Sequence, residues 1–510
     1  MSYTRVREQL SKPGFYPHRP SDVTIRESHS SCVFLAGDLA YKLKKPLRFD
    51  FLDYSDKATR RRLCGVEVRL NRRLAPALYL GVRAVVETED GRLDLGEEDD
   101  PRAVDYLVEM RRFDERRTLA SLVERGVAGA EEIRAVGRLL ARFHAAAEPA
   151  PAVDPRDAIR RATGETFASL HRLAPEAVAR ELLAAEELTA AYLVSHRGML
   201  LERAAAGLVR DGHGDLRAEH VVLEDPIAII DCLEFDPALR QIDVAEDLAF
   251  LTMDLTRLGA PELAFELVAS YRDAGGDPGE PGLLSFHAAQ RAWVRAKVEL
   301  LSGREVQARA YLRLGRRFGW QARRPLVLVV CGASGSGKSH LAAALAQVSG
   351  SVVVSSDAVR KELAGIEPAE TARREHYSAS FSRRTYRRLG ELAAEELERS
   401  GLVIVDATFR RRSERAQFAA GTGALAARVA FVECLAPREL RLERIRRRRA
   451  RGRDASDVTV ELARRQRFAP LTEVQAHHHL PLRTDRDTEG GVHAVEAWLN
   501  EIRISPSTDS

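Results

Sequence analysis

The order of apolar and polar positions divides the chain into two blocks. Over residues 22–113, short runs of alternating apolar and β-branched residues predict strands, with one helix near 58–74. Over 118–208, apolar residues recur at three- and four-residue spacing, which predicts helices. A short strand pair at 221–230 interrupts this pattern, which then continues to about residue 312. The first block is therefore expected to be an α+β domain.

The second block alternates strands and helices. Apolar runs predict four strands, at 326–330, 352–355, 402–405 and 430–434. Such alternation is typical of a parallel sheet with helices on both faces, so we expect an α/β domain. The basic segment 313–324 has no apolar periodicity and is expected to be a linker. These features predict domains at 1–312 and 325–504, followed by a disordered tail at 505–510.

Composition narrows the class of protein. The chain has 510 residues, of which 45% are hydrophobic and 30% charged, as in a globular protein of two or three domains. No run approaches the roughly 18 apolar residues of a membrane span, and the polar amino terminus lacks a signal-peptide core. Five scattered cysteines suit a reducing cytoplasm. The net charge of +4 gives no argument for a membrane or nucleic-acid partner.

A glycine-rich stretch joins the strand at 326–330 to a helix. It has the spacing Gly-x4-Gly-Lys-Ser and comprises Gly332, Ala333, Ser334, Gly335, Ser336, Gly337, Lys338, Ser339 and His340. Glycines let backbone N–H groups approach nucleotide phosphates, and the helix amino terminus adds partial positive charge. In this pattern Lys338 reaches the β- and γ-phosphates and the Ser339 hydroxyl ligates Mg²⁺. The stretch predicts a P-loop for ATP and Mg²⁺; a structural turn is the alternative.

Two aspartates end neighbouring predicted strands. Asp357 follows the strand at 352–355, and Asp406 follows the strand at 402–405. Because strand carboxyl ends point into the ligand crevice of such sheets, Asp357 could orient an acceptor hydroxyl and Asp406 could hold Mg²⁺. The alternatives are a helix N-cap for Asp357 and a solvated loop position for Asp406.

A helical stretch near the carboxyl end is strongly basic. Residues 438–453 contain nine arginines, and Arg444, Arg448 and Arg451 fall on one helix face. Such a face could close over the phosphates as a catalytic lid. A solvated basic helix and a nucleic-acid contact are the alternatives.

The second block resembles a known family through three segments: GASGSGKS, SSDAVRKELAG and IVDATFRRR. Together they are similar to P-loop small-molecule kinases of the gluconate and shikimate kinase type, to AAA-type ATP-binding domains and to the kinase half of polynucleotide kinases. The resemblance implies that Asp357 contacts the acceptor and that Arg360 helps to bind it.

The first block resembles another family. Residues 211–236, DGHGDLRAEHVVLEDPIAIIDCLEFD, are similar to the catalytic and metal loops of aminoglycoside phosphotransferases, which have a two-lobed, protein-kinase-like α+β fold. The resemblance implies that Asp215 orients an acceptor hydroxyl and that Asp231 holds Mg²⁺. It also implies a strand lysine, Lys42, that neutralises phosphates and pairs with Glu67. Lys44 points the same way on its strand and is an alternative.

One departure from this second family concerns metal. Five residues after Asp215 the family usually carries an asparagine that ligates Mg²⁺, and this chain has His220. Histidine can ligate a metal, although magnesium prefers oxygen. The domain is therefore expected to be an active kinase or a regulatory module. A buried polar network is the structural alternative for His213 and Asp215.

These observations predict a fusion of two kinase-like domains, with the function centred on the second. We expect ATP- and Mg²⁺-dependent transfer of phosphate to a small hydroxyl-bearing acceptor. A polynucleotide 5′-hydroxyl kinase and a nucleotide-hydrolysis switch without an acceptor are the alternatives. Neither the acceptor nor the oligomeric state follows from these motifs.

Overall fold

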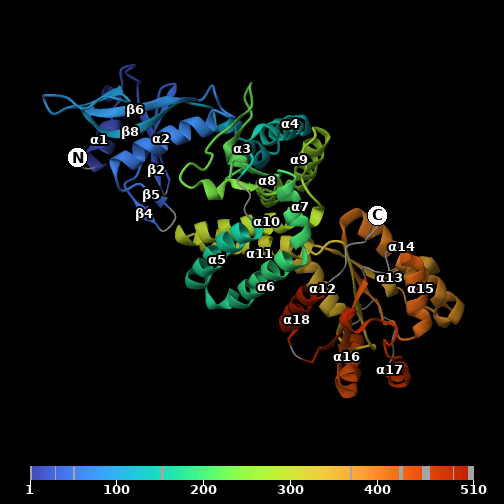
Figure 1. Cartoon of the computed structure of the whole chain (residues 1–510). Coiled ribbons are helices and arrows are strands. Elements are labelled where there is room, and N and C mark those ends of the chain that lie inside the picture. The colour runs from blue at the N-terminus through green and yellow to red at the C-terminus, as the bar shows by residue number, and fades with distance from the viewer. Residues whose placement is uncertain are drawn as a thin grey trace. The chain divides into compact units, whose positions relative to one another are not determined.

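The computed structural model divides into two compact units (Figure 1). It describes residues 3–502 except 29, 50–51, 151–153, 368–369, 371, 424–428, 451–459 and 486. Unit 1 comprises residues 1–165, 198–280 and 290–305, and unit 2 comprises 166–197, 281–289 and 306–510. The tail expected at 505–510 lies outside the described residues.

Unit 1 contains a six-stranded antiparallel sheet. Its order is β1 (Val23–Glu27), β2 (Ser31–Ala36), β3 (Leu39–Lys44), β8 (Ala103–Arg111), β6 (Tyr79–Glu87) and β7 (Leu93–Glu97). Successive residues face opposite sides, so Tyr41 and Leu43 enter one apolar cluster with α1 (Tyr3–Leu10). Helix α2 (Lys57–Asn71) packs on the other side, the side faced by Lys42 and Lys44.

The rest of unit 1 is mainly helical. Its helices are α3 (Leu119–Glu124), α4 (Ala130–Ala146), α7 (Arg197–Ala205), α8 (Val244–Arg257) and α9 (Pro261–Asp273). Three short strand pairs accompany them: β9 (Val209–Asp211) and β12 (Gln241–Asp243), β10 (Val221–Val222) and β11 (Ala228–Ile229), and β4 (Arg48–Phe49) and β5 (Leu52–Asp53). Four helices have residues assigned to each unit: α5 (Pro155–Leu173), α7, α10 (Pro281–Leu301) and α11 (Glu305–Gln321).

Unit 2 is built on a five-stranded parallel sheet. Its order is β14 (Val352–Ser355), β15 (Leu402–Asp406), β13 (Leu326–Cys331), β16 (Val429–Leu435) and β17 (His479–Arg483). Every residue of β13 is buried, as in a central strand covered on both faces. The helices of this unit are α6 (Ala179–Ser195), α11 (Glu305–Gln321), α12 (Lys338–Ser349), α13 (Ser356–Ala364), α14 (Ala379–Ser400), α15 (Arg412–Thr422), α16 (Arg438–Ala450), α17 (Val460–Arg465) and α18 (Thr488–Glu501).

The fold class expected from the sequence, an α+β unit followed by a parallel α/β unit, is confirmed. One cluster of apolar side chains joins the sheet to α12 and α18, and another joins it to α14 and α15. No helix in the described part of the chain is long and apolar enough to cross a membrane.

The segment expected to be a linker is different in the structure. Residues 313–321 form the end of α11, where Phe318 and Trp320 are buried. The Trp320 indole N–H donates to Glu496 of α18 at 2.7 Å, and Arg316 pairs with the same carboxylate at 2.9 Å. The apolar pattern was hidden because glycines occupy buried positions of α11. One of them, Gly319, would place an added Cβ only 2.7 Å from Leu188.

Candidate active sites

The glycine-rich stretch of unit 2 forms a tight loop between β13 and α12. Gly332, Gly335 and Gly337 have φ values of 137°, 80° and 95°, which side chains rarely adopt. A Cβ on Gly332 would lie 2.6 Å from the Cys434 carbonyl oxygen, and one on Gly335 would lie 2.5 Å from that of Arg441. The loop therefore requires glycine at these positions, and α12 begins at Lys338 immediately after it.

Three buried oxygen atoms near this loop lack protein partners. Among the described residues, Ser334 Oγ, Ser336 Oγ and Asp406 Oδ1 are buried and have no hydrogen-bond partner. Buried polar atoms are almost always paired, so unpaired ones grouped at one place indicate where a ligand would complete the hydrogen bonding. The arrangement suits a polar, oxygen-rich ligand at the mouth of the parallel sheet.

Asp406 is the last residue of β15 and lies opposite Ser355 of β14 and Val330 of β13. Its burial excludes the solvated loop position considered above. Asp406 and Lys338 both affect the Cys434 thiol. Burial raises the pKa of this thiol to about 12, Lys338 lowers it and Asp406 raises it. Cys434 itself lies beside the loop, because its carbonyl oxygen is the atom that a Cβ on Gly332 would meet.

Asp357 lies in the first turn of α13. The N-cap of this helix is Ser355, whose side chain accepts from the Asp357 N–H at 3.3 Å, so Asp357 is not the cap. Arg360, one turn later, is buried and donates to the His376 carbonyl oxygen at 2.6 Å. Its guanidinium also lies over the Tyr377 ring. One guanidinium N–H of Arg360 is therefore used within the protein, whereas its buried Nε has no hydrogen-bond partner among the described residues.

Two residues that sequence reasoning missed complete this region. The Tyr386 hydroxyl of α14 lies 3.0 Å from the Thr408 hydroxyl. Burial raises the pKa of Tyr386, Glu414 and Asp357 raise it further, and Arg360 lowers it. Tyr386 therefore shares its surroundings with Asp357 and Arg360. Thr408 could have been noticed, because it follows Asp406 by two residues.

The basic helix α16 contacts the loop directly. Arg444 donates to the Ser336 carbonyl oxygen at 3.3 Å and to that of Thr484 at 2.7 Å. The Thr484 hydroxyl donates to the same Ser336 oxygen. Arg444 thus supports the loop backbone in this structure. The side chain of Arg448 and the whole of Arg451 lie outside the described residues, so the lid stays a prediction.

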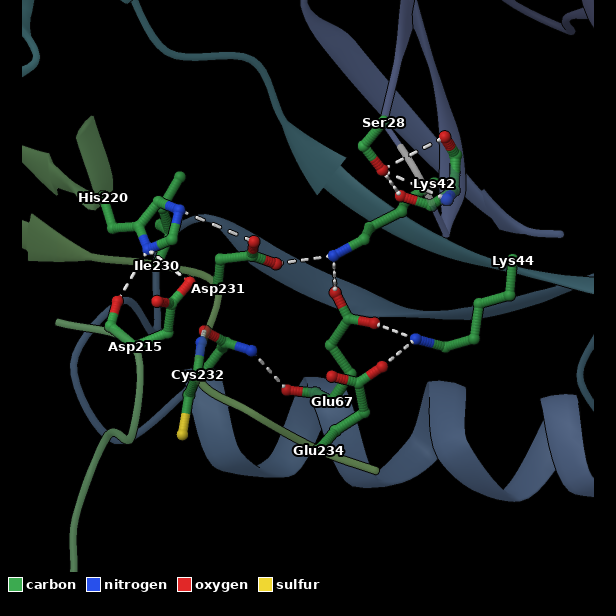
Figure 2. Close-up of polar contacts among 12 residues, drawn as sticks. Ser28, Lys42, Lys44, Glu67, Asp215, His220, Ile230, Asp231, Cys232 and Glu234 are labelled. Carbon is green, nitrogen blue, oxygen red and sulfur yellow. Dashed lines mark hydrogen bonds and ion pairs between the residues drawn. The ribbon is translucent and has the colours of Figure 1, made fainter. Parts of the chain in front are cut away.

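Unit 1 contains a second cluster of charged residues (Figure 2). The Lys42 ammonium lies 2.7 Å from Glu67 Oε1 and 2.6 Å from Asp231 Oδ1. Lys44 lies on the same face of β3 and pairs with Glu67 and Glu234, so that Glu67 stands between the two lysines. Lys42 is the lysine that reaches Asp231. Lys44 is almost fully buried, and its role is to hold the two glutamates.

Hydrogen bonds to Asp247 and from His213 hold the loop that carries Asp215. The Asp247 carboxylate accepts from the His213 N–H at 2.6 Å and the Gly214 N–H at 3.0 Å. The His213 ring is buried and donates through Nε2 to the Ile230 carbonyl oxygen at 3.0 Å. His213 therefore does belong to a buried polar network, and that network positions Asp215. Sequence reasoning did not find this role of Asp247, which lies in the first turn of α8.

Arg217, also missed from sequence, pairs with Asp215. Its Nε lies 3.1 Å from both carboxylate oxygens, and its Nη2 lies 3.1 Å from Oδ2. Burial alone would raise the pKa of Asp215, but the Arg217 guanidinium outweighs burial and lowers it. Likewise, the Lys42 ammonium outweighs the partial desolvation of Asp231 and holds the pKa of that carboxyl well below the usual range. Both carboxylates are therefore ionised at neutral pH.

The buried imidazole of His213 should make stability depend on pH. Burial lowers its pKa to about 4, whereas an unfolded histidine titrates near about 6.5. Its contribution is therefore complete above pH 6.5 and is lost as pH falls toward 4, up to about 3 kcal/mol. Urea unfolding at pH 7 and 4.5 should show a smaller pH dependence in His213→Gln. The exposed control His171→Gln should retain the wild-type pH dependence. If unfolding free energy fell equally between pH 7 and 4.5 in both variants, this assignment would be contradicted.

Known proteins are similar to different parts of this chain. The family model described as "AAA domain" matches residues 327–470. A gluconokinase from Sinorhizobium meliloti 1021 is 22% identical, covers 35% of this chain and 94% of its own, and has a TM-score of 0.27. A choline/ethanolamine kinase family protein from Mesorhizobium loti is 14% identical, covers 61% and 99%, and has a TM-score of 0.37.

Similarity over a longer stretch is found in mycobacteria. The uncharacterized protein Rv2004c of Mycobacterium tuberculosis is 35% identical over 352 residues, covering 67% of this chain and 68% of that protein. The uncharacterized protein Mb2027c of Mycobacterium bovis matches to the same extent. The chain therefore belongs to the family of these mycobacterial proteins.

Proposed function

We propose that unit 2 is an ATP- and Mg²⁺-dependent phosphotransferase that acts on a small hydroxyl-bearing acceptor. The observation that carries this proposal is the loop at 332–337, which leads into α12 at Lys338 and lies near Asp406, whose buried Oδ1 has no hydrogen-bond partner among the described residues. A glycine-lined loop at a helix start binds anionic phosphate through backbone N–H groups. A neighbouring carboxylate oxygen without a protein partner suits a hard cation.

Each residue has a role in this proposal. The loop N–H groups and Lys338 hold the phosphates, and Ser339 and Asp406 would hold Mg²⁺ through oxygen. The bound ion would neutralise charge on the β- and γ-phosphates. Asp357 accepts the acceptor proton as the acceptor oxygen bonds to the γ-phosphorus and the bond from that phosphorus to ADP breaks. Arg444 keeps the loop in shape by holding Ser336 and Thr484.

The proposal is tested with the full-length chain and γ-labelled ATP. Candidate acceptors are polyols, sugars, sugar acids and an oligonucleotide with a 5′-hydroxyl. Acceptor-dependent transfer should survive Asp215→Asn, which inactivates the unit 1 cluster, and should disappear in Lys338→Ala. Transfer to the oligonucleotide alone would favour the polynucleotide kinase. ATP hydrolysis that no acceptor accelerates would favour the switch, and transfer that persists in Lys338→Ala would contradict the proposal.

A further inference from the structure

His220 lies close to both carboxylates of unit 1, and Arg217 contacts one of them. His220 Nε2 lies 3.6 Å from Asp231 Oδ2, and Nδ1 lies 3.7 Å from Asp215 Oδ2. Figure 2 shows dashed lines from the His220 ring to both aspartates. A divalent cation bound between Asp215 and Asp231 would need unshared lone pairs on the surrounding side chains. The hydrogen bonds of the His220 ring show whether His220 has such a lone pair.

The hydrogen bonds of His220 determine its tautomer. Nδ1 lies 2.8 Å from the Asp215 backbone carbonyl oxygen, which can only accept, so Nδ1 carries the proton and donates. In the neutral ring the lone pair is then on Nε2. That nitrogen lies 2.9 Å from Arg217 Nη2, which can only donate. The lone pair is therefore already used, and His220 has none to offer a metal in this arrangement.

Arg217 also pairs with Asp215, the other side chain that could ligate such a cation. The same guanidinium contacts both oxygens of Asp215, as described above. Arg217 is itself largely buried, with 14% of its side chain exposed. Its Nη1 also pairs with Glu219, so one guanidinium links Asp215, His220 and Glu219. Asp231 differs, because 42% of its side chain is exposed and only its Oδ1 contacts Lys42.

We infer that Arg217 takes the electrostatic place of a second divalent cation, so that unit 1 binds a nucleoside triphosphate with one divalent cation, at Asp231. His220, expected from sequence to ligate metal, then serves as the neutral partner that orients Arg217. This inference concerns unit 1 and does not depend on catalysis in unit 2.

The test counts bound cations directly. The full-length variant Lys338→Ala, Ser339→Ala removes the expected phosphate and metal contacts of unit 2 and serves as background. Mn²⁺ replaces Mg²⁺, since both prefer oxygen ligands, and its binding is followed by electron paramagnetic resonance with a non-hydrolysable ATP analogue. The background should bind one Mn²⁺ per chain. Adding Arg217→Ala together with His220→Asn frees Asp215 and supplies a carboxamide oxygen, so this variant should bind two.

Two further variants make the result specific. Arg217→Lys keeps the positive charge and should retain one Mn²⁺. Arg102→Ala is the matched control, because Arg102 forms the same two-residue-apart pair with Asp100 on the surface, and it too should retain one. Two Mn²⁺ in the background, none in the background, or no gain in the Arg217→Ala, His220→Asn variant would each overturn the inference. Failure of the acceptor assay with intact Lys338 would concern only unit 2.

Discussion

Replacing Asp357 by asparagine is expected to slow acceptor phosphorylation by about 10²–10⁴-fold, the usual range for loss of a positioned proton acceptor. Asparagine keeps the size of the side chain but cannot take the proton from the acceptor hydroxyl. The helix should tolerate the change, because Ser355 and not Asp357 caps α13. The turnover number should therefore fall while the KM for ATP changes little. Steady-state kinetics with varied ATP and varied acceptor separate these effects.

The matched control for this variant is Glu395→Gln, which also neutralises a carboxylate in unit 2. Glu395 is an exposed residue of α14 that pairs with Arg388. It should leave both kinetic constants close to those of the wild type. Unchanged turnover in Asp357→Asn would remove Asp357 from the proposed chemistry. A rise in the KM for ATP alone would instead indicate a role in binding nucleotide.

Replacing Glu67 by alanine is expected to lower the free energy of unfolding by about 3–5 kcal/mol, because it removes one of the two carboxylate partners of each of two buried ammonium groups. Glu67 is fully buried and pairs with both Lys42 and Lys44. Glu234 and Glu67 raise the pKa of Lys44 well above its usual value, against the effect of its burial, so the ammonium stays charged. Glu67→Gln, which keeps the shape and removes the charge, should also be destabilising.

Urea unfolding, monitored by hydrogen exchange of the backbone amides of β3 and α2, measures this effect within unit 1. The control is Glu87→Ala, whose pairing with Arg5 is largely exposed and should contribute less than about 1 kcal/mol. A loss in Glu67→Ala no larger than in the control would show that the charged cluster does not hold β3 to α2. A larger loss of unfolding free energy in Glu67→Ala than in Glu67→Gln would reflect the cavity left by alanine.

The sequence by itself determined the features that depend on short-range pattern. A strand, a glycine-rich turn and a helix within fifteen residues specify the P-loop, because the required backbone angles and the buried strand are local properties. The carboxylates of Asp357 and Asp406 could be placed at one edge of the sheet, because parallel strands bring their carboxyl ends together. Alternation along β3 placed Lys42 and Lys44 on one face, although it could not distinguish them.

Only the tertiary structure decided which partners these residues have. Glu234 joins Lys44 across 190 residues, and Arg444 meets Ser336 across 108. No periodic pattern reports such contacts, because loops and chain crossings bring the residues together. Arg217 is close to Asp215 in sequence, yet its role also depended on the fold, since the loop conformation turns one guanidinium toward both Asp215 and His220. Ion pairs and hydrogen bonds require particular distances and directions, and those exist only once the chain has packed.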